Sequence, residues 1–163
     1  MSSQEHVLLP PTEELPLFVY GTLLSGFKNH EIYLKQSTKE MHPARIRDVS
    51  LWHARDAGYP VIVDGSSEVT GELVWLKNFE VSIPEMDLLE GYNADPRAST
   101  YVRVAKCVVD LESGKAVNAY VYWYNRSIAE ISGPVIEIPS GNWREFMGTD
   151  GHQEGTRILG RRD

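Results

Sequence analysis

Glu90 is an acidic residue that falls on the apolar side of a predicted helix. The segment VSIPEMDLLEGY indicates a helix over residues 83–90, and at 100° per residue Glu90 shares a stripe with the apolar residues Ile83 and Met86. Burial and the negative end of the helix dipole both act to raise the pKa of such a carboxylate. A carboxylate with a raised pKa can accept and return a proton, so Glu90 is a candidate general acid/base. The alternative is that the last turn frays and Glu90 points into water.

The two ends of this helix carry sequence signals. Ser82 is expected to cap its start, with Glu85 reaching back to complete a capping box, and Gly91 stands where a left-handed residue commonly ends a helix. Asp87 lies one turn before Glu90, where it can orient Glu90 or share a proton with it. A solvated acid on the helix surface is the more common role for a residue like Asp87.

The stretch LFVYGTLLSGFK, residues 17–28, predicts a strand that runs into a glycine turn. Gly21 can take main-chain angles that other residues resist. A phosphate-binding loop would need Lys and then Ser or Thr after its second glycine, whereas here Gly26 is followed by phenylalanine. We interpret the turn at residues 20–23 as a set of main-chain N–H groups that can face an anion or a carbonyl oxygen. An ordinary structural turn is the alternative.

Cysteine and histidine chemistry has no support in the sequence. Cys107 is the single cysteine, and the alternating run YVRVAKCVVD predicts that it is a buried, inert thiol. The five histidines show no spacing typical of a zinc site or a Cys-His pair. We therefore expect no metal.

The composition predicts one soluble domain. A chain of 163 residues with 42% hydrophobic content can bury a sizeable core, and it has no apolar run of the length that a membrane span needs. A net charge of -7 and a pI near 5.2 oppose nucleic acid as a partner. The chain cannot form an intrachain disulfide, and its start lacks the layout of a secretion signal, so we expect a cytoplasmic protein.

Short strands account for most of the predicted structure. Runs rich in Val, Ile, Tyr and Trp, bounded by turn residues, predict strands at 15–20, 44–54, 59–65, 69–77, 101–112 and 116–125. The last two are separated by SGK and predict a hairpin. Short connections favour antiparallel pairing, so we expect an α+β fold around a curled sheet or small barrel. The tryptophans of these strands are expected in the core: Trp52, Trp75 and Trp123.

The two ends of the chain are predicted to differ from this domain. Residues 1–14 and 148–163 are polar or glycine-rich and are expected to be flexible, which leaves a domain at 15–147.

Several ordered stretches resemble the gamma-glutamylcyclotransferase-like superfamily, and most closely its gamma-glutamylamine cyclotransferase branch. They are FVYGTLLSGFKNHEIYL, AGYPVIVDG, VTGELVWL, MDLLEGY and TYVRV, in consistent order over roughly residues 15–125, and SGNWREF is similar to bacterial members. Agreement among several ordered motifs is far more specific than any one of them. The resemblance implies a small mixed, mostly antiparallel β-barrel with flanking helices and a cavity near the 20–23 turn.

The resemblance also implies an activity. Members of the superfamily cyclise a gamma-glutamyl group without metal or cofactor, releasing 5-oxoproline and an amine or amino acid. By position, Glu90 matches the catalytic glutamate. The matches to substrate-binding or cavity residues are Tyr20, Gly21, Thr22, Leu23, Tyr59 and Tyr101. Tyr59 and the proline after it equally fit plain packing at the start of a strand.

Three functions remain compatible with the sequence. The first is a cyclotransferase acting on a small gamma-glutamyl substrate, with no nucleic acid, membrane or obligate protein partner. The second is a non-catalytic domain of the same fold that binds an amino-acid-like ligand, and the third is an interaction module. Glu90 favours the enzyme, because a binding module has no need to place a carboxylate on an apolar stripe. The identity of the substrate stays open, since the polar loop GYNADPRAST can reshape the site of the leaving group.

Overall fold

The computed structural model describes residues 13–92, 95, 97 and 99–148. The two segments expected to be flexible, 1–14 and 148–163, lie almost wholly outside these described residues.

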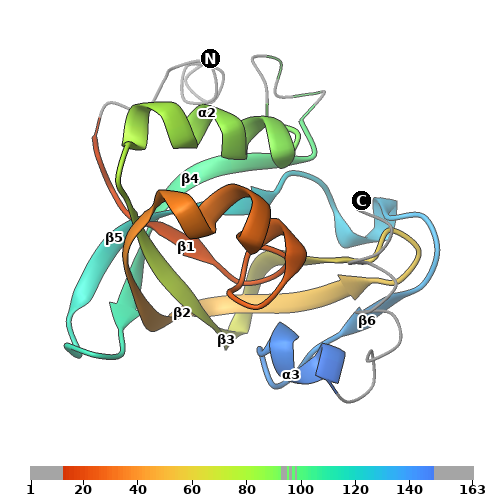
Figure 1. Cartoon of the computed structure of the whole chain (residues 1–163). Helices are drawn as coiled ribbons and strands as arrows, with labels where there is room; N and C mark the ends of the chain where they lie inside the picture. Colours follow the sequence, from red (N-terminus) through yellow and green to blue (C-terminus); the bar gives the residue numbers. More distant parts are fainter. Residues whose placement is uncertain (1–12, 93–94, 96, 98, 149–163) are drawn as a thin grey trace.

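A closed β-barrel forms the centre of the protein (Figure 1). Its five strands are β1 (Leu17–Val19), β2 (Thr38–Ala54), β3 (Tyr59–Leu76), β4 (Tyr101–Asp110) and β5 (Ala116–Tyr124). They run in the order β3-β1-β5-β4-β2, and β2 pairs back with β3 to close the barrel. Every pair is antiparallel except β1 with β5, which is parallel. The expected α+β fold with a small mixed, mostly antiparallel barrel is confirmed, as is the hairpin between the last two strands.

The hairpin of β2 and β3 is longer than the sequence pattern indicated. The runs at 59–65 and 69–77 were expected to be separate strands, because DGSSE has the composition of a turn. That expectation is wrong, since β3 continues through this region. The pairing with β2 is irregular here: Asp48 has φ 62°, and Val49 faces both Asp64 and Ser67. Such a bulge bends the ribbon. Beyond it, β2 pairs with the short strand β6 (Val135–Glu137).

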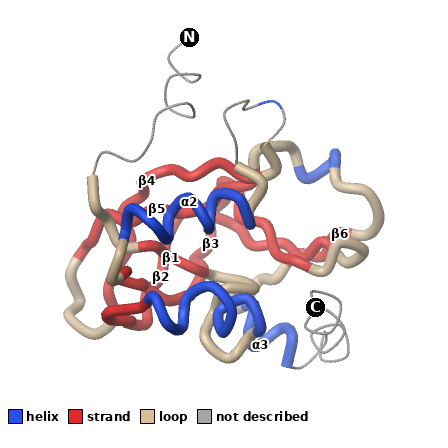
Figure 2. Tube along the Cα trace, turned by 45° about the horizontal axis from the view of Figure 1, so that its top comes forward, coloured by secondary structure: helices blue, strands red, loops and turns tan. Residues whose placement is uncertain are grey.

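The helix α2 (Phe79–Leu89) crosses one side of the barrel, with α3 (Trp143–Gly148) near β6 (Figures 1 and 2). Asn78, not Ser82, is its N-cap, and Ser82 is buried inside the helix, so the expected capping box is wrong. The helix starts earlier because this places Phe79 in the core. Its predicted end is confirmed, since Gly91 has φ 74°. The described helices are all too short or too polar to span a lipid bilayer.

Short turns of other helical types follow β1 and precede β6. They are the π-helical η1 (His30–Leu34) and the 3₁₀ turn η2 (Lys35–Ser37), and a further 3₁₀ turn, η4 (Ile128–Glu130), precedes β6.

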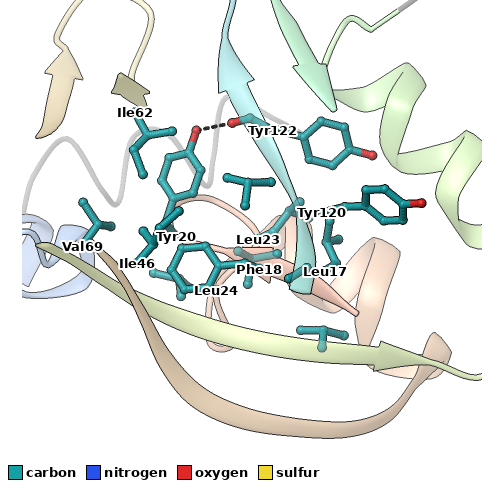
Figure 3. Close-up of a cluster of buried hydrophobic side chains, with 14 of the residues drawn as sticks. Leu17, Phe18, Tyr20, Leu23, Leu24, Ile46, Ile62, Val69, Tyr120 and Tyr122 are labelled. Atoms are coloured by element: carbon teal, nitrogen blue, oxygen red, sulfur yellow. Dashed lines mark hydrogen bonds between the residues drawn. The ribbon is translucent and has the colours of Figure 1, made fainter. Parts of the chain in front are cut away.

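The core fills the barrel and extends beneath its helices (Figure 3). Trp143 of α3 is fully buried, whereas the three tryptophans expected in the core are only partly buried and pack against its edge: Trp52, Trp75 and Trp123. Cys107 is exposed, which contradicts the expected buried thiol. Cys107 and Arg103 lie on the same face of β4, and that face is covered only near Arg103. There the Arg103 guanidinium lies over the rings of Tyr92 and Tyr120.

Candidate active site

A cavity of about 210 Å³ opens beside the turn that follows β1. Its walls come from this turn, the start of β3, the end of α2, and strands β4 and β5. Every site residue expected from the sequence lines it: Tyr20, Gly21, Thr22, Leu23, Tyr59, Glu90 and Tyr101. Positions far apart in the sequence therefore meet at one concave site, which is the usual form of a small-molecule site.

Ser25, two residues after the 20–23 turn, is held by a cluster of polar side chains. The Ser25 main-chain N–H donates to Glu72 Oε1 at 2.9 Å, and the Ser25 hydroxyl donates to Glu72 Oε2 at 2.7 Å. Arg144 of α3 donates to the Ser25 carbonyl at 2.5 Å and lies 3.1 Å from Glu72 Oε2. Among the described residues, the N–H groups of Gly21, Thr22 and Leu23 have no acceptor within the chain. These three donors are therefore available to the oxygens of a ligand.

Gly21 is required by close packing rather than by an unusual main-chain angle. Its φ is not positive, which corrects the expected reason for a glycine here. A Cβ atom at this position would lie 2.3 Å from Pro60 Cγ, well inside van der Waals contact. The absence of a side chain thus lets the start of β3 approach the turn, and both segments line the cavity.

Glu90 is the C-cap residue of α2, at the edge of the cavity. Its main-chain N–H donates to the Met86 carbonyl at 2.9 Å, and the next residue, Gly91, accepts from the Thr100 N–H at 3.1 Å. The end of the helix is thus tied to the residue that precedes β4, and its last turn does not fray. Ile83 and Met86 are fully buried, and Glu90 is half-buried. Glu90 is the one charged side chain among the described residues that line the cavity.

Three buried tyrosines, Tyr20, Tyr101 and Tyr122, line the cavity together with Glu90. Burial raises the pKa of Tyr20 well above its ordinary value, and the negative charge of Glu90 raises it further. The pKa values of Tyr101 and Tyr122 are also raised, first by burial, and Glu90 contributes to both. These hydroxyls therefore stay protonated at neutral pH. Their acceptors are the Tyr122 carbonyl for Tyr20, the Pro60 carbonyl for Tyr101 and Asp87 Oδ1 for Tyr122.

The two aromatic residues expected from the resemblance form one wall. The Tyr101 hydroxyl donates to the Pro60 carbonyl at 2.7 Å, which fixes the start of β3 against β4. The rings of Tyr59 and Tyr101 meet edge to face, with centroids 5.9 Å apart.

Comparison with known proteins shows which family this chain belongs to. Residues 17–145 match the family described as gamma-glutamyl cyclotransferase, AIG2-like. A candidate gamma-glutamylcyclotransferase of Methanocaldococcus jannaschii is 30% identical over 132 residues, covering 81% of this chain and 98% of that protein. The chain belongs to the AIG2-like gamma-glutamyl cyclotransferase family. This confirms the superfamily expected from the sequence, and the chain is an enzyme of the gamma-glutamylcyclotransferase type.

Further relatives of this cyclotransferase agree in sequence and in fold. The gamma-L-glutamyl-butirosin B gamma-glutamyl cyclotransferase of Niallia circulans is 31% identical over 130 residues, 80% of this chain and 76% of that protein. An AIG2-like protein of Mus musculus has a TM-score of 0.54 at 25% identity, over 74% of this chain and 84% of that one. A protein of Pyrococcus horikoshii has a TM-score of 0.60 at 19% identity, covering 85% and 97%. The gamma-glutamylamine branch stays a prediction.

Sequence reasoning missed two residues of the cyclotransferase cavity, Asn29 and Tyr122, and favoured the wrong role for Asp87. Asn29 is buried, lines the cavity and donates to the Thr22 hydroxyl at 3.1 Å. Tyr122 lines the cavity from β5, and its hydroxyl donates to Asp87 Oδ1 at 2.7 Å. Asp87 is therefore not the solvated surface acid that was expected. The alternation in AVNAYVYWYN could have placed Tyr122 on the buried side, but no local pattern indicates its partner.

Among the residues that the structure describes, no group of three or more His, Cys, Asp or Glu side chains could hold a metal ion.

Proposed function

We propose that this protein cyclises the gamma-glutamyl group of a gamma-glutamyl amine or peptide, releasing 5-oxoproline and the amine. The observation that carries the proposal is the pairing of two features on one cavity. One is Glu90, the single charged side chain among the described lining residues, and the other is the turn whose N–H groups at Gly21, Thr22 and Leu23 lack acceptors. The first can move a proton, and the second can hold the oxygens of a glutamyl group.

The substrate supplies its own nucleophile in this reaction. The neutral α-amine attacks the γ-carbonyl carbon, a C–N bond forms to close the five-membered ring, and the C–N bond to the leaving amine breaks. One proton passes from the attacking nitrogen to the leaving nitrogen, so atoms and charge balance without a further reactant. The protein then has two tasks, which are to fold the glutamyl chain into a reactive shape and to carry that proton.

Glu90 is the group that we propose carries the proton. As a half-buried carboxylate it accepts a proton from the attacking amine and returns it to the departing nitrogen. The buried tyrosines beside it, Tyr20, Tyr101 and Tyr122, keep their own protons, so they do not compete for this role. The N–H groups of the 20–23 turn stabilise either the α-carboxylate or the oxygen that becomes negative in the transition state.

Purified protein incubated with a panel of substrates tests the proposal. The panel contains γ-glutamyl-n-butylamine, γ-glutamylalanine and glutathione, and 5-oxoproline is measured by chromatography. We expect release from at least one of them, in stoichiometric amounts with the freed amine. Release of free glutamate instead would mean hydrolysis, and an absence of both products across the panel would contradict the proposal.

A further inference from the structure

Tyr122 makes two hydrogen bonds, one to the 20–23 turn and one to α2, which line different parts of the cavity. Its carbonyl oxygen accepts from the Tyr20 hydroxyl at 2.7 Å, which ties β5 to the 20–23 turn. Its own hydroxyl donates to Asp87 Oδ1 at 2.7 Å, which ties the same strand to α2. Figure 3 shows the Tyr20 hydroxyl directed at the main chain of Tyr122, while the Tyr122 ring points the other way. One residue therefore links both parts of the candidate active site.

The contact with Asp87 lies in a shielded environment. The Tyr122 side chain is buried, and Asp87 is 18% exposed. Arg103 Nε lies 3.3 Å from the same Oδ1 atom, close enough for an ion pair but not aligned for a hydrogen bond. Tyr122 is thus the aligned donor to this oxygen, and a hydrogen bond to a charged acceptor away from water is stronger than one at the surface.

Asp87 in turn fixes the end of α2. It lies three residues before Glu90, and its carbonyl accepts from the Tyr92 N–H at 2.8 Å, beyond the helix end. The side chain of Asp87 is thus bonded to β5, and its main-chain carbonyl is bonded to Tyr92. Together these two contacts hold the last turn of α2 in place. From this geometry we propose that Tyr122 is a positioning residue, which sets Glu90 relative to the 20–23 turn through its hydrogen bond to Asp87. The catalytic part of this inference rests on the proposed function.

The variant Tyr122→Phe removes only the hydroxyl group and keeps the ring and the carbonyl that accepts from Tyr20. We expect kcat to fall about tenfold with KM nearly unchanged, because a displaced proton carrier slows the chemical step without removing binding contacts. Tyr120→Phe is the matched control. It lies on the same strand and also loses one hydroxyl hydrogen bond, to the Glu13 carbonyl at 2.8 Å, but that bond leads away from α2. Its kcat should match that of the parent protein.

Hydrogen exchange tests the link without any substrate. The amides of Glu90, Gly91 and Tyr92 are each bonded to a carbonyl of α2. In Tyr122→Phe their exchange should become about tenfold faster, the factor expected when one hydrogen bond to a charged group is lost. In Tyr120→Phe it should be unchanged. Equal protection in Tyr122→Phe and the parent protein would overturn the proposal, whatever the activity.

A double-mutant cycle separates action through Asp87 from direct contact with substrate. Asp87→Ala removes the acceptor, so adding Tyr122→Phe to it should lower kcat no further. Asp87→Asn keeps an acceptor oxygen, so it should retain most of the turnover and stay sensitive to Tyr122→Phe, even if Asp87→Ala fails to fold. Additive losses would overturn the positioning role. A parent protein that releases no 5-oxoproline would contradict the proposed function instead, and the exchange measurement would still decide whether Tyr122 fixes the end of α2.

Discussion

Pro60 packs directly against Gly21, in space that any side chain at position 21 would occupy. Because a Cβ atom there would lie 2.3 Å from Pro60 Cγ, the variant Gly21→Ala must push the start of β3 away from the turn. Overpacking of this kind costs about 1–3 kcal/mol in the free energy of unfolding. The displaced Pro60 should also weaken the binding of a gamma-glutamyl ligand.

Thermal melts and ligand titrations of Gly21→Ala measure both effects. Gly148→Ala is the control, since among the described residues no atom outside its own stretch of helix lies within 4 Å of the Cβ position there. A Gly21→Ala protein as stable as the parent would show that the turn moves freely, contrary to the packing described above.

Arg144 of α3 bonds to Ser25, two residues after the 20–23 turn, and to Glu72, which also bonds to Ser25. Replacing it with Met removes these donors while keeping an apolar chain against the Phe27 ring. We expect KM to rise about threefold with little change in kcat, because a partly exposed ion pair contributes modestly and the role proposed for the turn is binding. Steady-state kinetics decide this, with Lys35→Met as a control for loss of an exposed positive charge paired with Glu31. A fall in kcat alone would contradict a role in binding.

His42 joins β2 to β4 by a pH-dependent contact. Its hydrogen bond to Asp110 raises the pKa of His42 against the opposing effect of burial, and Glu40 raises it further. Burial acts to raise the pKa of Asp110, but its hydrogen bonds from His42 and from the main chain at Glu112 and Ser113 hold it below its usual range. A raised histidine pKa stabilises the fold below its unfolded value of about 6.5, and this contribution is lost as the pH rises through the folded pKa.

His42→Gln should therefore destabilise the protein most near pH 5.5, and the difference from the parent should shrink by pH 8.5. Below about pH 4 the contribution should also decline, as Asp110 becomes protonated. Urea unfolding of the two proteins at each pH measures the difference. A difference that grew between pH 5.5 and 8.5 would give the opposite sign and contradict this account.

Metal chelation and loss of the thiol should leave turnover unchanged. The proposed reaction uses a carboxylate and main-chain groups, and the exposed Cys107 is not among the residues that line the cavity. Activity measured after dialysis against EDTA, and separately for Cys107→Ser, should equal that of the untreated parent. Inactivation by EDTA that added zinc or magnesium restores would require a different mechanism.

The sequence predicts the barrel and the composition of its cavity better than it predicts the supporting contacts. Alternation and turn residues locate the strands, and helical periodicity places Glu90 beside Ile83 and Met86, because these patterns follow from the local geometry of the chain. The start of α2 was misplaced because burial of Phe79 outweighed the local capping signal at Ser82.

Contacts between distant segments were beyond the reach of such patterns. The pairing of Tyr122 with Asp87 spans 35 residues, and the bond from Arg144 to Ser25 spans 119. Cys107 shows the same limit, because alternation assigns it to a strand face but not whether another element covers that part of the face. Local pattern thus identifies the residues that line the cavity, and tertiary packing decides what holds them.

Glu90→Gln tests the central claim that Glu90 carries the proton. The substitution keeps the size of the side chain but cannot exchange a proton at working pH, so kcat for 5-oxoproline release should fall by about 10²- to 10⁴-fold. The melting temperature should match or slightly exceed that of the parent, since a carboxylate at the negative end of a helix costs stability. Calorimetric affinity for a non-reactive glutamyl analogue should change little, because the 20–23 turn is intact. Unchanged turnover in a folded Glu90→Gln protein would contradict the account.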